Sequence, residues 1–384
     1  MNLPQDFEQM MTQHLGKEEY DQLAEALSLP APTSIRINPK KVAAEELAML
    51  KEAEQVPWCK DGFYLKERPS FTFDPLFHAG CYYVQDSSAM FVGWMFRKAL
   101  DLIDSPHLNV LDLCAAPGGK TTDLAASLRE KSGDDFSLVA NEVMKKRFGV
   151  LRSNVRVWGD PRVGVTSKDP SAFRERGAYD IIVADVPCSG EGMFRKDEKA
   201  VEDWSEETVA FCAARQRRII SDIWPSLKDG GVMIYSTCTF NKEENDGNVL
   251  WIAKELGAEI IDFGGVEGVV KTECGYSLLP GFVPGEGQYA AALRKRGEYS
   301  PTVLGNVLSS VEIPAVPLKD YPRVEVDLHQ ALDYLHGDAL RLPSAPSGMI
   351  YVCYKGQVLG EAKNIGSRCN NLYPKESRIR MNVK

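Results

Sequence analysis

The sequence lacks the patterns that define several common protein classes. Its nine cysteines form no C-x-x-C pair, which argues against a disulfide framework and against a zinc ribbon. Its five histidines show no metal-ligand spacing, so we predict no metal site. No apolar run approaches the roughly 20 residues that a membrane helix needs, and the N-terminal stretch has early acidic residues and no apolar signal segment. We therefore expect a cytoplasmic protein with no membrane partner.

Acidic residues outnumber basic ones in the chain as a whole, and positive charge gathers near the C-terminus. The net charge of −9 argues against a surface coated for nucleic acid, although it leaves room for a local basic groove. Residues 355–384 carry seven Lys or Arg against two Glu, a net charge of +5. Such a stretch is either a disordered end or an ordered RNA-contacting module. We favour the second because residues 370–373 (NNLY) interrupt the charges.

Length and local composition indicate several domains. With 384 residues, the chain can build two or three separate cores. Helical periodicity over 5–28, with strand-like stretches at 34–39, 56–67 and 80–90, predicts a small α+β region. Pro and Ser become frequent after residue 297, which is typical of a linker. We predict an N-terminal module at 1–79, a central domain at 80–296, a linker at 297–325, and a small β-rich C-terminal module with a hairpin at 326–384.

The central segment alternates between strands and helices. Short apolar stretches predict strands at 108–113, 137–142, 163–169, 179–187 and 230–240. Amphipathic segments at 121–130 and 144–159 separate the first three of them. Buried strands joined by helices form a parallel sheet with both faces covered, so the predicted class is α/β with a Rossmann-like core. The ligand of such a sheet binds at the carboxyl ends of its strands.

The loop after the first of these strands resembles a phosphate-binding loop but departs from it. Gly119-Lys120-Thr121 matches the end of the pattern G-x-x-x-x-G-K-[ST], yet Cys114 stands where the first glycine belongs. Small residues and glycines let the backbone approach a ligand closely, and the following helix offers free N–H groups to an anion. The predicted ligand loop consists of Cys114, Ala115, Ala116, Pro117, Gly118, Gly119 and Lys120.

Acidic residues at the next strand ends distinguish the possible ligands. Glu142 ends the second strand, where a carboxylate can accept both hydroxyls of a ribose. Asp169 follows the third strand, where an adenine would lie. A nucleoside triphosphatase would need an aspartate that serves magnesium, and the neighbours of Asp185, the one candidate, do not suit that role. The set therefore favours an adenosine with an amino-acid tail.

Two cysteines follow the last two predicted strands of the sheet. Cys188 lies in ADVPCSGEG and Cys238 in YSTCTFNKEEN, so both should lie over the ligand cleft. A single cysteine there is more often a packed small residue, but two of them favour a function.

Methylation of a pyrimidine at C5 is a reaction that uses such a pair. A thiolate that adds to C6 makes C5 nucleophilic, and the adduct must afterwards lose the C5 proton and expel the thiolate. A second cysteine is well placed to help that release. Asp185 could polarise N3 of the base, for which it would have to carry a proton. Lys120 could favour the thiolate or hold the base.

These motifs carry a family resemblance over nearly the whole chain. CAAPGGKT, ADVPCSGEGMFRKD and YSTCTFNKEEN resemble the cofactor loop and the two cysteine motifs of the NOL1/NOP2/Sun family of RNA cytosine-C5 methyltransferases. SIRINP and GCYYVQDSSAM resemble N-terminal landmarks of that family. GQVLGEAKNIGSRCNNLYPKESRIR is similar to the PUA-like end of the bacterial members that act on small-subunit (16S) ribosomal RNA.

The resemblance implies a cofactor, a substrate and residue roles. The cofactor would be S-adenosylmethionine, and the product 5-methylcytosine in structured RNA, with RNA-binding modules on both sides of the catalytic domain. Cys238 would be the nucleophile and Cys188 the residue that aids release. The loop from Cys114 to Lys120 would hold the methionine end of the cofactor. Further cofactor contacts would come from Glu142, Arg147, Asp169 and Asp185.

Several alternatives remain open at this point. The register between the second helix and the third strand is uncertain, so Asp160 competes with Asp169 for the cofactor. Gln288-Tyr289 stands where two aromatics are commoner in the family, which leaves the last strands of the domain uncertain. Transfer RNA is an alternative substrate, and a non-catalytic RNA-binding or assembly factor is an alternative function. Nothing in the sequence suggests more than a monomer.

Overall fold

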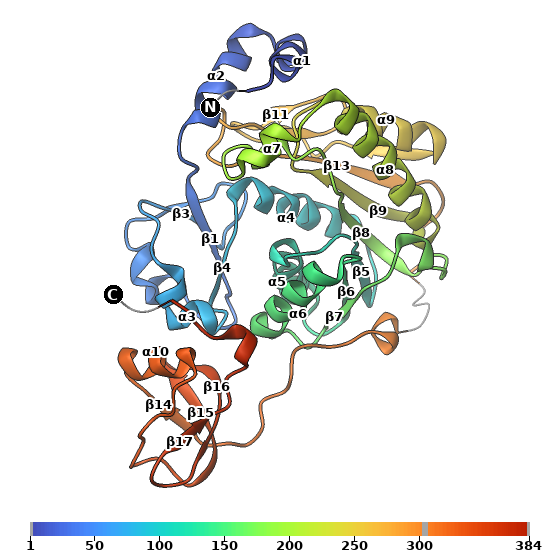
Figure 1. Cartoon of the computed structure of the whole chain (residues 1–384). Helices are drawn as coiled ribbons and strands as arrows, with labels where there is room; N and C mark the ends of the chain where they lie inside the picture. The colour runs from blue at the N-terminus through green and yellow to red at the C-terminus, as the bar shows by residue number, and fades with distance from the viewer. Residues whose placement is uncertain (1–2, 302–305, 382–384) are drawn as a thin grey trace.

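The computed structural model describes residues 3–301 and 306–381, which form three regions around a central sheet (Figure 1). The N-terminal helices lie at one end of the molecule, the large mixed sheet and its helices form the middle, and a small β-rich module lies at the other end. This arrangement confirms the predicted α/β core with a mixed N-terminal module and a β-rich C-terminal one. Within the described residues, no helix has the length and apolar character required to cross a membrane.

The stretch with helical periodicity at 5–28 forms two helices. α1 spans Gln5–Leu15 and α2 spans Lys17–Ser28. Gly16 lies between them with φ 97°, a left-handed conformation that ends α1 and redirects the chain. The prediction missed this break because the apolar positions continue on both sides of the glycine.

A small four-stranded sheet follows the two helices. Its strand order is β2-β3-β1-β4, with the bounds β1 Thr33–Ile37, β2 Glu54–Gln55, β3 Gly62–Leu65 and β4 Tyr82–Val84. The strand predicted at 80–90 is therefore wrong in its second half, where helix α4 begins at Ser87 and runs to Leu100. Asp86 caps this helix by accepting a hydrogen bond from the Ala89 N–H at 3.3 Å. A short helix, α3 (Pro75–His78), precedes β4.

The central sheet has nine strands in the described residues, in the order β11-β12-β13-β9-β8-β5-β6-β7, with β10 paired to β13. Its parallel strands are β5 Leu108–Asp112, β6 Phe136–Asn141, β7 Val163–Thr166, β8 Tyr179–Asp185 and β9 Leu227–Thr237. The antiparallel extension consists of β10 Ala258–Ile261, β11 Val270–Lys271, β12 Tyr276–Leu278 and β13 Gln288–Lys295. Each parallel strand matches a predicted one within a few residues. The first two helices after the strands are α5 Gly119–Ser132 and α6 Lys145–Trp158.

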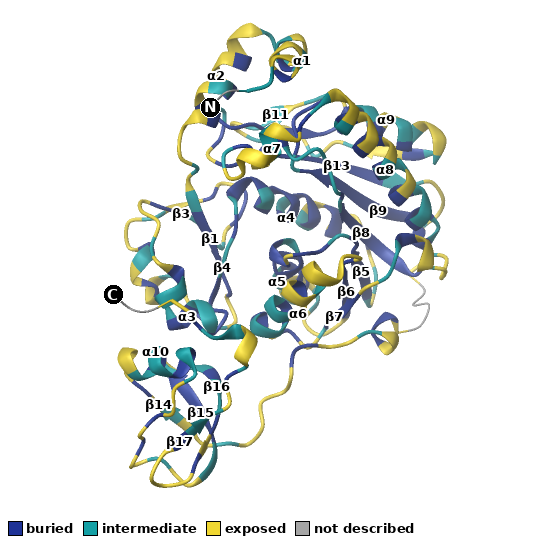
Figure 2. Cartoon of the chain, in the orientation of Figure 1, coloured by how far each residue is buried: buried dark blue, intermediate teal, exposed yellow. Residues whose placement is uncertain are grey.

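Helices cover both faces of this sheet (Figure 2). Alternate residues of its strands belong to different hydrophobic clusters, one on each face. Val110 and Ile181 pack with residues of α4, α5 and α6 in one hydrophobic cluster. Leu111 and Ile182 pack on the other face with residues of α8 (Glu206–Ile223) and α9 (Asp246–Glu255). The short α7 (Glu198–Glu202) precedes α8. These two buried layers fix the carboxyl ends of the parallel strands, where the predicted site lies.

The segment predicted as a linker is partly packed. Val307 and Leu308 are buried in the α8–α9 cluster, and Val165 of β7 pairs with Glu312. Residues 302–305 of that segment lie outside the described residues.

The C-terminal module begins earlier than the predicted residue 326. β14 (Arg323–Glu325) already belongs to its sheet, which continues with β15 Gly348–Tyr354, β16 Gln357–Asn364 and β17 Cys369–Asn371. β15 and β16 form the predicted hairpin, and helix α10 spans Leu328–His336. This module shares one hydrophobic cluster with the N-terminal sheet. The basic segment is ordered as far as the structure describes it, to residue 381.

Candidate active site

Two neighbouring parallel strands bring the predicted cysteines together. β8 ends at Asp185 and β9 at Thr237, and Asp185 pairs with Ser236 in register. Cys188 and Cys238 follow these ends, and their Sγ atoms are 3.3 Å apart. Among the nine cysteines, these two and Cys114 are partly exposed, whereas the other six are buried. The structure therefore places a pair of accessible thiols at the edge of the sheet where the sequence predicts it.

The two thiols differ in acidity. The hydrogen bond from the Cys188 thiol lowers the pKa of Cys238 and outweighs burial, which raises it. The nearby charges act in opposite directions: Asp185 raises this pKa and Lys120 lowers it. The same hydrogen bond, together with burial, raises the pKa of Cys188 well above its usual value. These directions make Cys238 the more acidic thiol of the pair.

Asp185 and Lys120 form an ion pair beside the cysteines. Lys120 Nζ lies 2.8 Å from Asp185 Oδ2. Burial lowers the pKa of Lys120, but the charge and the hydrogen bond of Asp185 outweigh burial and raise it. Asp185 Oδ1 also accepts hydrogen bonds from Ser236 Oγ at 2.8 Å and Gln288 Nε2 at 3.0 Å. Three donors thus hold the Asp185 carboxylate in place, and its action on N3 of a base stays a prediction.

The predicted ligand loop runs from the end of β5 to the start of α5. Ala115 N–H donates to Asn141 O at 2.8 Å, and Arg147 Nη2 donates to Ala116 O at 2.5 Å, so the loop is fixed to β6 and α6. Gly118 has φ 112°, which favours glycine, and a Cβ at Gly119 would lie 3.2 Å from Tyr83 Cε1. Burial raises the pKa of Cys114, which makes that thiol a neutral part of the loop wall.

Buried carboxylate oxygens with unused hydrogen-bonding capacity mark where a ligand fits. Among the described residues, Asp112 Oδ1 and Glu142 Oε2 are buried without a hydrogen-bond partner. Asp112 Oδ2 accepts from Thr121 Oγ1 at 2.6 Å, and burial raises the pKa of Asp112 to about 7. Glu142 Oε1 accepts from Met144 N–H at 2.8 Å, and Arg147 Nη1 lies 3.3 Å from Glu142 Oε2. Such acceptors suit the ammonium group and the ribose hydroxyls of an adenosine with an amino-acid tail.

Asp160 and Asp169, the two candidates for the cofactor contact, lie at opposite ends of strand β7. Asp169 follows β7 at the edge that carries the other site residues. It accepts hydrogen bonds from Ser171 N–H and Oγ, which lower its pKa, and its side chain remains 45% exposed. Asp160 precedes β7 and is 2.6 Å from Arg129 Nη2. The geometry brings Asp169, and not Asp160, to the carboxyl ends of the strands.

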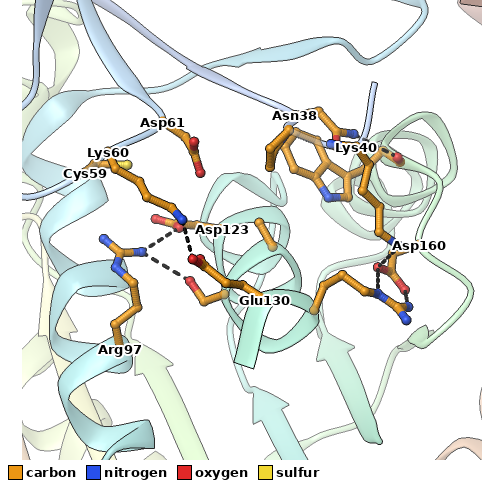
Figure 3. A pocket seen from close by; sticks show the side chains of 14 residues that line it. Asn38, Lys40, Cys59, Lys60, Asp61, Arg97, Asp123, Glu130 and Asp160 are labelled. Carbon is orange, nitrogen blue, oxygen red and sulfur yellow. Dashed lines mark hydrogen bonds and ion pairs between the residues drawn. The ribbon is translucent and has the colours of Figure 1, made fainter. Parts of the chain in front are cut away.

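Asp160 instead lines a separate cavity of about 290 Å³ between the N-terminal sheet and the backs of α4 and α5 (Figure 3). Asp160 and Arg97 lie on opposite sides of this cavity, and Lys60 and Glu130 form an ion pair in its wall. Arg97 is itself paired with Asp123 at 3.1 Å. The cavity contains none of the cysteines or loop residues of the predicted site.

Gln288 and Tyr289, the departure from the family pattern, have clear contacts. Gln288 is the donor to Asp185 described above, and the Tyr289 hydroxyl donates to Asp246 Oδ1 at 2.7 Å. Both residues begin β13, which pairs with β9. The polar pair therefore supports the site from the antiparallel side of the sheet.

Sequence reasoning missed two buried carboxylates next to the cysteines. Glu191 follows Cys188 and Glu244 follows Cys238, and both are fully buried. Asn241 donates from Nδ2 to Glu191 Oε1 and to Glu244 Oε1, each at 2.8 Å. Both glutamates stand within the quoted cysteine motifs, but a glutamate in a polar loop gives no sequence signal of burial. Asp112 lies within the strand predicted at 108–113, where a single polar residue likewise gives no sequence signal of a ligand contact.

No group of three or more His, Cys, Asp or Glu side chains in the described part of the chain could hold a metal ion. The site consists of two thiols, an ion pair, and two carboxylates beside a glycine-rich loop. It brings a candidate nucleophile close to buried acceptors that a ligand could use.

Comparison with known proteins agrees with this geometry. Three family models match the chain: the 16S rRNA methyltransferase RsmB/F over residues 99–294, the N-terminal domain of 16S rRNA methyltransferase RsmF over 3–87, and the methyltransferase RsmF PUA domain over 321–379. A ribosomal RNA small subunit methyltransferase F from Pectobacterium atrosepticum is 34% identical, and the alignment covers 78% of this chain and 64% of that protein. The protein of the same name from Aliivibrio salmonicida is 33% identical, with 85% and 70% covered. The chain thus spans slightly less than two thirds of the first relative.

Solved structures share the fold. A methyltransferase homolog protein from Pyrococcus horikoshii superposes with a TM-score of 0.63 at 28% identity, covering 75% of this chain and 93% of that one. NSun6 from the same organism gives a TM-score of 0.64 at 20% identity, covering 77% and 99%, which shows the common fold alone. The family predicted from the cysteine and loop motifs is confirmed, and the chain belongs to the RsmB/F family of 16S rRNA methyltransferases.

Proposed function

We propose that this protein transfers a methyl group from S-adenosylmethionine to C5 of a cytosine in 16S ribosomal RNA. The observation that carries the proposal is the thiol pair, Cys188 and Cys238, 3.3 Å apart beside the Lys120–Asp185 ion pair. The family and the names of its relatives support the methyl-transfer chemistry and the ribosomal RNA substrate. The C-terminal module, which matches a PUA domain, would contribute RNA contacts.

The cofactor would lie along the carboxyl ends of β5, β6 and β7. The loop from Cys114 to Lys120 and the unpartnered Asp112 Oδ1 would hold its methionine end. Glu142 would accept its ribose hydroxyls, and Arg147 would fix both Glu142 and the loop. Asp169 would border the adenine. When bound, S-adenosylmethionine supplies an electrophilic methyl group next to the cysteine pair.

The residues of the chain would activate the base and later release it. The target cytosine must leave its stack, which costs a few kcal/mol and favours loops or helix junctions. The Cys238 thiolate adds to C6, and the electron density shifts to C5. Asp185 Oδ2, which accepts from Lys120 alone among the described residues, has capacity for the exocyclic amine of the base. Lys120 supplies positive charge as the ring gains electrons.

Release requires a second group. After methylation, C5 must lose its proton so that the C6–S bond can break and free Cys238. The C5 proton passes to solvent, the C5–H electron pair forms the C5=C6 double bond again, and the C6–S pair leaves with the Cys238 sulfur. Cys188 is adjacent to that sulfur, and we assign it to stabilising the departing thiolate by donating a hydrogen bond. The first cysteine thus makes the bond and the second assists its cleavage.

A methyl-transfer assay with nucleoside analysis tests the function. Purified protein would be incubated with labelled S-adenosylmethionine and unmodified 16S RNA, small ribosomal subunits or transfer RNA. We expect 5-methylcytidine in one small-subunit substrate and none with Cys238→Ala. Methylation of transfer RNA alone would change the substrate, and no transfer to any RNA would favour an assembly factor. We further propose that the protein acts in the cytoplasm and as a monomer. Sedimentation of the purified protein would check the monomeric state.

A further inference from the structure

We propose that Glu191 is a positioning residue for the cysteine pair, because its buried carboxylate binds the segment after Cys238 to the segment after Cys188. This inference rests on the proposed cytosine chemistry for its meaning. Its test, however, measures the reactivity of Cys238 and needs no RNA.

The Glu191 carboxylate accepts hydrogen bonds from three residues that belong to two other segments of the chain. Its Oε2 atom accepts from the backbone N–H groups of Phe240 at 2.5 Å and Asn241 at 3.0 Å. Its Oε1 atom accepts from Asn241 Nδ2 at 2.8 Å and from Trp204 Nε1 at 3.0 Å. The side chain is fully buried. A buried carboxylate with this many donors is held in one position and holds its donors in turn.

Further hydrogen bonds connect the segment after Cys188 to the segment after Cys238, between Glu191 and the two sulfurs. Gly192 N–H donates to Cys238 O at 2.8 Å, and Ser189 Oγ lies 2.8 Å from Thr239 Oγ1. A Cβ at Gly192 would lie 2.8 Å from Cys238 O, so the backbones are in close approach. The two segments are therefore in contact from the thiol pair to the Glu191 carboxylate.

Glu244, in the segment after Cys238, is a second buried carboxylate that connects the two cysteine segments. It accepts from Asn241 Nδ2, from Gln216 Nε2 at 2.6 Å and from Ser189 N–H at 3.1 Å. Burial raises the pKa of Glu244 to about 7. Asn241 thus connects two buried carboxylates, one from each cysteine segment, and a shift of either segment would break charge-assisted hydrogen bonds.

The N-terminal helix α1 covers this network. Phe7 packs edge-on against Trp204 with ring centroids 5.4 Å apart, and against Phe194 at 5.2 Å. Trp204, Phe194 and Phe240 all belong to the cluster that contains the buried side of α1 and α2. The carboxylate of Glu191 is thereby kept from water, which strengthens each of its hydrogen bonds.

An isosteric substitution separates this role from simple space filling. Glu191→Gln keeps the shape but must point its NH₂ group at donors on one of its two sides, because both carboxylate oxygens accept. We expect the Cys238 segment to shift and the hydrogen bond from Cys188 to weaken. The pKa of Cys238 should then rise by about one unit, which makes its alkylation about tenfold slower at a pH below the wild-type midpoint.

The experiment measures the rate of iodoacetamide alkylation of Cys238 against pH, by mass spectrometry of its peptide, in the full chain. Glu243→Gln is the matched control, because Glu243 lies in the segment after Cys238, next to Glu244, and is exposed. We expect an upward shift of the midpoint for Glu191→Gln and none for the control. Binding of S-adenosylmethionine, measured by calorimetry, should stay unchanged because its site lies on β5 to β7.

A double mutant decides whether Glu191 acts through the thiol pair. In a Cys188→Ala background, Glu191→Gln should cause little further shift, because the hydrogen bond that it positions is already absent. Additive shifts, or a wild-type midpoint in a folded Glu191→Gln variant, would overturn the proposal. If Glu191→Gln does not fold, Asn241→Ala answers the same question through the same midpoint. An enzyme that fails to methylate RNA but shows these shifts would refute only the proposed function.

Discussion

Replacing Cys188 with alanine should make Cys238 a poorer nucleophile at neutral pH. The wild-type thiolate is stabilised by the Cys188 thiol, whose Sγ lies 3.3 Å away, and the hydrogen bond from Cys188 is the largest cause of the lowered pKa of Cys238. Alanine removes the donor and leaves Lys120 as the remaining stabilising charge. The pKa of Cys238 should therefore rise.

The size of this rise follows from the strength of the hydrogen bond. A hydrogen bond to a charged group is worth about 1.5–3 kcal/mol, and a thiol donor belongs at the low end, about 1.5–2 kcal/mol. Since one pKa unit corresponds to about 1.4 kcal/mol, the pKa should rise by about 1–1.5 units. At a pH below the wild-type pKa, the thiolate fraction and the alkylation rate should fall by about 10- to 30-fold.

Alkylation by iodoacetamide between pH 5 and pH 10, followed on the peptide that contains Cys238, measures this shift. Cys188→Ser is the matched control because its hydroxyl keeps a donor at the same place, so its midpoint should stay near that of the wild type. In the wild type, Cys238 should react before Cys188. Equal midpoints for the wild type and Cys188→Ala, or earlier reaction of Cys188, would refute the assignment of the thiolate.

Two further predictions concern the cofactor pocket and the N-terminal helices. Burial raises the pKa of Asp112 to about 7, so the carboxylate is ionised above and protonated below that pH. Affinity for S-adenosylmethionine should therefore rise between pH 5.5 and pH 7, with protons released on binding. Asp112→Asn should remove this pH dependence. If calorimetry finds the same pH dependence in the variant, Asp112 does not contact the cofactor. Phe7 is fully buried, so Phe7→Ala should lower the free energy of unfolding by about 3–5 kcal/mol. Phe211→Ala, at a site 67% exposed, should have little effect, and equal urea midpoints for both variants would contradict the packing described for α1.

The parallel core could be predicted because its strands are buried on both faces. Such strands read as short apolar runs, and 108–113 and 179–187 match β5 and β8 within two residues at each end. The positions of Cys188 and Cys238 follow from the same rule, since they come directly after neighbouring parallel strands. The roles of the site residues remain predictions that the experiments above address.

Other parts could not be predicted because their signals are weak or distant. Gly16 ends α1 within a stretch whose apolar spacing continues, and Asp86 starts α4 directly after the short strand β4. The burial of Glu191 depends on donors about 50 residues away in the chain, at Phe240 and Asn241. No local pattern reports such a partner, because an isolated glutamate in a loop is normally exposed.

The central claim is that Cys238 forms a covalent bond to RNA that Cys188 helps to break. Its most direct measurement is a denaturing gel of the Cys188→Ala and Cys238→Ala variants expressed in cells, run with and without ribonuclease. In the Cys188→Ala variant, addition should still occur at a reduced rate while release stalls. We therefore predict a slow, ribonuclease-sensitive band for Cys188→Ala alone, and sequencing the attached RNA would identify the target. A band for Cys238→Ala instead would reverse the two roles, and no band from either variant, with a wild type that fails to methylate 16S RNA, would contradict the account.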